Sequence, residues 1–332
     1  MPAIPSLFSN PASASLMIIQ NLSNSPILAL EGNILWQLEN LKNDSAKRLL
    51  EEVCSGLVHR EIALQMDAVV PRGPFLQAKE NGVPEVHLQV AFLELLWAFI
   101  YSWMIFYEEG VQRPQLPDTT LTTGPAPADL LERAAALQEW CKSLARGYSP
   151  WPAELPSPKN YANSSERYFG EKANIVFQHA TAFLLTHERA HAVFEHLPIV
   201  QDQPENRELR LQLEKEADVF AFESLVRSGL SDKEKALESW AILAVVLATF
   251  YVYKDPRQAL ISTTHPSLHH RVGSLVRSLT LKEDGYRYYF YLLCRLVLQD
   301  LFPDVLAPKY QFEDAEDALS DALDRLDELT KQ

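Results

Sequence analysis

The sequence is poor in cysteine and has no long run of basic residues. Its three cysteines, Cys54, Cys141 and Cys294, lie far apart and form no CxxC pair, which excludes a disulfide framework and a zinc knuckle. The 30 Lys and Arg residues are outnumbered by 44 Asp and Glu. The net charge of −14 argues against a nucleic-acid ligand, because phosphate contacts require a basic patch. We therefore expect protein or small-molecule partners and a reducing compartment.

Features of exported and membrane proteins are also scarce. The N-terminal region contains early prolines and no basic stretch, which is not typical of a secretory signal. Residues 88–106 are almost long enough to span a membrane, but they include Gln89, Glu94 and Ser102. Residues 239–253 are apolar and too short to cross comfortably. We expect buried core helices in a cytoplasmic protein; membrane contact by residues 88–106 is the alternative.

The hydrophobic pattern is mostly that of helices. Periodicity and end signals predict helices over residues 44–60, 88–107, 130–146, 171–196, 205–227, 231–253, 266–278 and 285–302. Strand patterns are limited to residues 16–19, 27–30 and 85–88. Proline-rich stretches at 110–128 and 147–159 are typical of loops. The expected fold class is mainly α with a small β-sheet (α+β), as one domain over residues 1–312.

The last twenty residues, 313–332, differ from the rest in charge. They hold eight acidic and two basic residues, which is −6 of the total −14. Leu319, Leu323, Leu326 and Leu329 form a stripe at helical spacing. This pattern predicts an acidic amphipathic helix packed on the body; a helix that binds a regulatory partner is the alternative.

One motif carries a specific chemistry. His187-Glu188-Arg189-Ala190-His191 has the form H-E-x-x-H within a helical pattern, where residues four apart share a face. Both imidazoles can therefore reach one metal ion. Glu188, next to the first ligand, is placed to act as a general base without itself binding the metal.

A catalytic zinc needs a third protein ligand, and the helix over 205–227 offers one. Glu214 and Asp218 lie four residues apart, which suits a ligand and a carboxylate that accepts the N–H of a liganding imidazole. Glu216 is a competing ligand, but it lies about 200° around the helix from Glu214, so only one of the two can face the metal.

These residues resemble the gluzincin metallopeptidases, whose pattern is H-E-x-x-H followed by a glutamate in E-x-x-x-D. The sequence that begins at Glu214 is similar to a motif of the family that includes HtpX and the CAAX prenyl proteases. Thr264-His265-Pro266 followed by Arg271 matches a further motif of that family. The resemblance implies a zincin-like domain with Zn²⁺ on His187, His191 and Glu214. It also implies that Asp218 supports a ligand, His265 lies near the substrate oxyanion and Arg271 organises the site.

A second resemblance covers the segment before the motif. Residues 82–109 and the H-E-x-x-H sequence look similar to bacterial phage-exclusion peptidases of the Lit type. This resemblance implies a soluble frame and suggests the hypothesis of a triggered defence effector that cleaves one host protein.

The sequence thus predicts a soluble zinc-dependent endopeptidase with Glu188 as the base. The alternative is a zinc-binding interaction or regulatory module without general proteolytic activity. We expect residues 85–88 to form the sheet edge along which substrate lies. His196 lies about 140° around the helix from the metal face and is assigned to the helix end. His269 and His270 are assigned to the surface.

Overall fold

The computed structural model describes residues 22–39, 45–115, 129–226, 229–261, 265–307 and 312–331. Three short strands, β1 (Ile62–Gln65), β2 (Phe75–Ala78) and β3 (Pro84–Gln89), accompany many helices. The α-helices are α2 (Glu31–Glu39), α3 (Ser45–Cys54), α4 (Val90–Ile105), α5 (Leu130–Ser143), α6 (Ser164–Val193), α7 (His196–Asp202), α8 (Arg207–Leu225), α9 (Asp232–Thr249), α10 (Leu268–Ser278), α11 (Asp284–Leu301), α12 (Pro303–Leu306) and α13 (Ala315–Thr330). A mainly α protein with a small sheet is confirmed.

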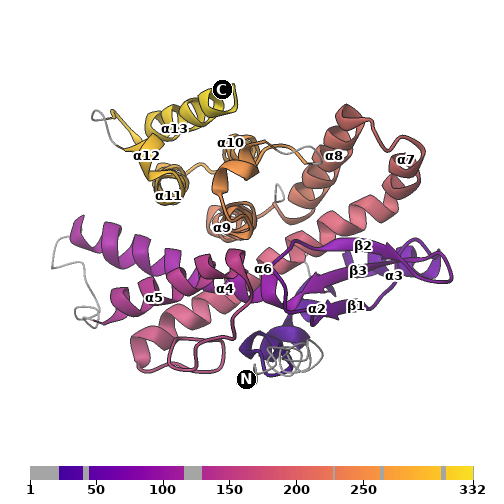
Figure 1. Ribbon diagram of the computed structural model, residues 1–332, viewed down its shortest axis with the longest axis horizontal. Helices are drawn as coiled ribbons and strands as arrows, with labels where there is room; N and C mark the ends of the chain where they lie inside the picture. Colours follow the sequence, from indigo (N-terminus) through magenta and orange to yellow (C-terminus); the bar gives the residue numbers. More distant parts are fainter. Residues whose placement is uncertain are drawn as a thin grey trace, which may run out of the picture.

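The long helix α6 organises the molecule. It packs against the helices α8, α9, α4 and α2, and it also contacts the strands β2 and β3. In Figure 1, α10, α11, α12 and α13 lie beyond α9 as seen from α4 and α6. Asn163 caps the start of α6, because its side-chain oxygen accepts the backbone N–H of Glu166 at 2.9 Å.

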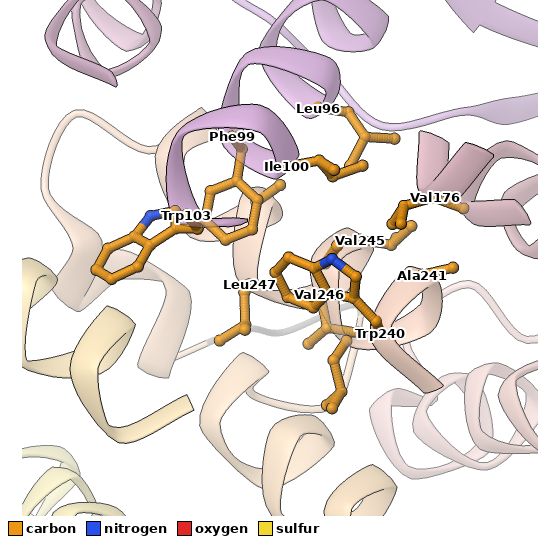
Figure 2. Close-up of a cluster of buried hydrophobic side chains, with 14 of the residues drawn as sticks. Leu96, Phe99, Ile100, Trp103, Val176, Trp240, Ala241, Val245, Val246 and Leu247 are labelled. Atoms are coloured by element: carbon orange, nitrogen blue, oxygen red, sulfur yellow. The ribbon is translucent and has the colours of Figure 1, made fainter. Parts of the chain in front are cut away.

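The core is built around α4 and α9. Figure 2 shows Phe99 and Trp103 of α4 facing Trp240 and Val246 of α9. The two helical stretches that contain α4 and α9, Val90–Gln115 and Asp232–Val252, are long and apolar enough to span a membrane, yet they are mostly buried within the structure. Helices that are hydrophobic all round are found in protein interiors as well as in membranes. The interpretation of residues 88–106 as part of a core helix agrees with this burial.

The sheet has the order β1-β3-β2, with β3 parallel to β1 and antiparallel to β2. Gly82, at φ 79°, allows the tight turn that joins β2 to β3. The predicted strand at 85–88 is confirmed as β3. Its predicted use as a substrate edge is wrong, because β3 is the central strand and pairs on both sides. β2 is an edge strand instead.

Other boundaries differ from the predictions. Residues 27–30 are not a strand but part of a 3-10 helix, Pro26–Leu30, started by Pro26 and capped by the Ser25 hydroxyl. The predicted strand at 16–19, residues 116–128 of the predicted loop, and Thr264 lie outside the described residues. Helix α6 begins seven residues before the predicted start and ends at Val193, three residues before the predicted end.

The acidic C-terminal helix is present as α13 and packs mainly on α11. Its leucine stripe contributes Leu319 and Leu326 to the core, and Ala322 beside them is also fully buried. In this structure α13 is thus an amphipathic helix with its apolar side packed on the body.

Candidate active site

Helices α6 and α8 bring three metal-binding side chains to one point. His187 and His191 lie one turn apart on α6, and their Nε2 atoms are 3.2 Å apart. Glu214 of α8 reaches the same point, with Oε2 3.5 Å from Nε2 of His187 and Oε1 3.6 Å from Nε2 of His191. The three ligand atoms all lie within 4.8 Å of one another. The structure thus brings together the three predicted ligands.

The spacing of these atoms fits a small tetrahedral cation. Ligands at 2.0–2.2 Å from zinc in tetrahedral geometry lie about 3.3 Å from one another. The buried Oε2 of Glu214 accepts no well-formed hydrogen bond in the described part of the chain; its nearest polar neighbours are Nε2 of His265 at 3.3 Å and Nε2 of His187 at 3.5 Å. A buried carboxylate oxygen without a donor is costly, and a cation at this point would satisfy it. The donor set therefore fits a metal ion of the zinc class.

The electrostatics of the site also favour a positive charge. Burial alone would lower the pKa of His187, but the carboxylates of Asp218 and Glu214 outweigh burial and raise the pKa to about 10. Burial and the neighbouring His187 lower the pKa of His191 to about 4. The pocket can therefore hold one positive charge readily and resists a second proton.

Glu188 lies beside the ligands without joining them. Its side chain is buried, and burial, with the nearby negative charge of Glu214, raises its pKa to about 7 even though His187 opposes the shift. A carboxylate with a pKa close to neutrality can accept and return a proton near physiological pH. This is the property that a general base requires.

Asp218 and Arg271 form a largely buried pair behind His187. Asp218 Oδ1 lies 3.0 Å from Nδ1 of His187, on the side of the ring away from the ligand atom Nε2. The guanidinium of Arg271 donates from Nε to Oδ2 of Asp218 at 2.9 Å and from Nη2 to Oδ1 at 2.6 Å. Arg271 thereby holds the pKa of Asp218 below its usual value and keeps it charged toward the ring.

His196 is a site residue that the sequence analysis missed. Its Nδ1 lies 2.8 Å from Nδ1 of His191, and its Nε2 lies 3.3 Å from Oε2 of Glu216. Glu216 does not join the ligand group; it is exposed and contacts His196 instead. The assignment of His196 to the helix end, away from the metal face, is wrong. Helix α6 ends at Val193, and Glu195, at φ 54°, turns the chain so that His196 lies against His191.

A cleft of about 310 Å³ opens onto the metal-binding group. Glu188, His191 and Glu214 line it together with Pro74, Phe75 and Leu76 of the β2 segment. His265 also lines this cleft, half-exposed, with Nε2 3.3 Å from Oε2 of Glu214. The arrangement can admit an extended chain between the edge strand β2 and the helix α6. Residues 75–78 alternate only weakly between apolar and polar, so periodicity does not predict the strand β2.

Comparison with known proteins agrees with a peptidase. The family model described as Peptidase U49 matches residues 86–291, a range that includes H-E-x-x-H, Glu214, Asp218, His265 and Arg271. The chain is 26% identical over 227 residues to the cell death peptidase of Escherichia coli K12, covering 68% of this chain and 72% of the relative. No solved structure gave a significant match. These matches support the resemblance to Lit-type peptidases and do not support the HtpX-type resemblance.

Proposed function

Because the chain belongs to the peptidase U49 family, we propose that it is a zinc-dependent endopeptidase whose metal centre is formed by His187, His191 and Glu214. The observation that carries the proposal is the convergence of these three ligand atoms within 4.8 Å beside a cleft. Two imidazoles and one carboxylate form the His₂Glu ligand set of hydrolytic zinc sites, which leaves a further position for the reaction. A bound Zn²⁺ would polarise the peptide carbonyl and make water a stronger nucleophile.

Glu188 is the general base of the proposed reaction. It takes the proton of the attacking water and delivers that proton to the leaving amine when the peptide bond breaks. Its pKa of about 7 suits both transfers, since a group of this pKa is easily ionised and easily protonated at neutral pH. The half-exposed His265 at the cleft is placed to donate to the developing oxyanion, a contribution typically worth about 3 kcal/mol per donor.

The substrate lies as an extended chain along β2. An edge strand offers unpaired backbone groups on one side, and pairing through the backbone places a chain with little demand on its sequence. Phe75 and Leu76 add apolar contacts at the cleft and supply selectivity for the adjoining substrate side chains. Substrate selection beyond these contacts depends on the rest of the target protein.

The biological role proposed is that of a triggered cytoplasmic effector in bacterial defence, with one host protein as its substrate. The name of the similar E. coli protein, cell death peptidase, supports a role in which cleavage stops the cell. The exposed acidic side of α13 is the surface proposed for a regulatory partner, because the apolar side of that helix is already packed on α11. No membrane or nucleic-acid partner is included in the proposal.

The test combines metal content with cleavage. Elemental analysis of purified protein should find zinc, and His187→Asn, His191→Asn and Glu214→Gln should each remove the ion from this centre. Glu188→Gln should keep the zinc and abolish cleavage, measured by comparing host proteomes after expression of the wild type and of the variant. Glu223→Gln, which changes an exposed glutamate of α8, is the matched control and should behave as wild type.

Two results would overturn the proposal. Cleavage by Glu188→Gln at the wild-type rate would remove Glu188 from the role of base. Zinc held by the three ligands with no Glu188-dependent cleavage under any trigger would favour the alternative, a zinc-binding regulatory module.

A further inference from the structure

A second cluster of metal-binding side chains lies away from the cleft. His269 and His270 occupy the first turn of α10, and Asp327 lies near the end of α13. Oδ1 of Asp327 is 2.8 Å from Nε2 of His269 and 2.7 Å from Nε2 of His270. The described part of the chain holds two groups of His, Cys, Asp or Glu whose ligand atoms converge in this way, and this is the second.

The close approach of the two helices explains the short distances. Gly273 lies one turn after His269, and a Cβ atom at Gly273 would meet Cδ1 of Leu323 at only 3.0 Å. Leu323 lies one turn before Asp327, so α10 and α13 run in opposite directions where they touch. The glycine lets the helices approach closely at one turn, and the next turn then presents His269 to Asp327.

The Nε2 atom of each histidine lies against Oδ1 of Asp327. His269 is fully buried, and its Nδ1 has no hydrogen-bond partner among the described residues, so the contact at Nε2 is the one that orients its ring. Nδ1 of His270 lies 2.8 Å from the hydroxyl of Ser267. Nε2–H of His270 donates to Asp327, and Nδ1 accepts from that hydroxyl. With a metal ion at Nε2 these roles would reverse, so that Nδ1 would donate to the hydroxyl and the Nε2 lone pair would face the ion. The assignment of His270 to the surface is confirmed, and that of His269 is wrong.

The chemistry of the cluster is that of a transition-metal site. Two imidazoles and a carboxylate suit Zn²⁺ and similar ions, whereas Mg²⁺ and Ca²⁺ prefer oxygen ligands alone. Tetrahedral ligands around zinc lie about 3.3 Å apart, so a widening of about half an ångström between Asp327 and each imidazole would admit the ion. The exposed His270 and the partly exposed Asp327 leave a path from solvent and room for a water ligand.

We propose that His269, His270 and Asp327 form a second zinc site, which fastens the acidic C-terminal helix α13 to α10. The site is structural, since it lies outside the cleft. The second site is connected to the first metal centre through α10. His270 precedes Arg271, and Arg271 binds Asp218, which contacts His187. Zinc at this second site fixes the turn of α10 that carries Arg271.

Metal stoichiometry tests the proposal. Wild-type protein equilibrated with Zn²⁺ and then dialysed should hold two ions per chain by elemental analysis. Asp327→Asn and His269→Asn should each hold one, and so should His187→Asn, which empties the other centre. Asp324→Asn makes the same charge change at an exposed position one turn away on α13, and it should hold two. A single zinc that is lost in His187→Asn and retained in Asp327→Asn would overturn the proposal.

Hydrogen exchange of α13 provides a second readout. Zinc should slow amide exchange over residues 315–330 at least tenfold in the wild type and in His187→Asn, and should have no such effect in Asp327→Asn. The partly exposed Asp327 keeps the test usable if a change at the buried His269 prevents folding. Equal exchange of α13 with and without zinc in His187→Asn would show that no ion fastens this helix.

Discussion

The Nδ1 atoms of His191 and His196 lie 2.8 Å apart, so one ring donates to the other across the end of α6. The contact depends on the turn at Glu195, the one described non-glycine residue with a positive φ. Left-handed backbone at such a residue costs about 1 kcal/mol, and it is retained where the surrounding structure needs it. The turn returns His196 to His191, and Glu216 holds the far side of the His196 ring.

Removal of His196 should weaken metal binding without removing a ligand. His196→Ala frees the ring of His191 to rotate and change tautomer, and loss of such a supporting contact typically lowers metal affinity about 10 to 100-fold. Competition with a chelator of known affinity measures the change. Glu216→Gln should have a smaller effect because Glu216 is exposed. An unchanged affinity in His196→Ala would show that packing alone orients His191.

Arg271 should be needed for stability, because it pairs with the charge of Asp218. Arg271→Met leaves the charge of Asp218 buried without its partner, which typically costs about 3 kcal/mol of unfolding free energy. The double variant Arg271→Met/Asp218→Asn should recover part of this loss, because the unpaired charge is gone. Denaturant unfolding of the metal-free protein measures the loss in Arg271→Met and its recovery in the double variant. Arg277→Met, exposed on the same helix, is the control, and a loss in that variant equal to the loss in Arg271→Met would contradict the pairing argument.

Glu94 should make stability depend on pH. It is fully buried in α4, where the Ser25 hydroxyl donates to it at 2.6 Å, and burial raises its pKa from 4.5 to about 7. Because the folded state holds the proton more tightly than the unfolded state, stability from this group is greatest below pH 4.5. It falls between pH 4.5 and 7, by about 3 kcal/mol in total.

Glu94→Gln keeps an acceptor for Ser25 and cannot ionise. Its unfolding free energy should therefore exceed that of the wild type at pH 8, and the difference should shrink as the pH is lowered through 7 toward 4.5. Denaturant unfolding at a series of pH values measures this slope, and Glu139→Gln, at an exposed position on α5, should keep the wild-type slope. The same slope in Glu94→Gln and wild type would rule out Glu94 as the source.

The sequence could predict the residues of one helix turn better than contacts between distant segments. H-E-x-x-H and E-x-x-x-D are local patterns, and helical periodicity alone places His187 beside His191 and Glu214 beside Asp218. The contact of His196 with His191 was not predicted, because an angle around the helix axis applies only to residues within the helix, and α6 ends at Val193. The burial of His269 was not predicted, because it depends on α13, which lies more than forty residues later in the chain. The edge position of β2 depends likewise on strand order, which no local pattern contains.

The C-terminal helix should contribute to stability through its apolar stripe. Leu326 is fully buried where α13 packs on the body, and truncation of such a leucine to alanine typically costs about 3 kcal/mol, because contacts are lost and a cavity remains. Leu326→Ala should therefore lower the unfolding free energy by about that amount. Glu328→Ala, at an exposed neighbouring position, should change it by less than about 0.5 kcal/mol. If Leu326→Ala and Glu328→Ala are equally stable, α13 is detached in solution, and the acidic helix is free to act as a mobile regulatory segment.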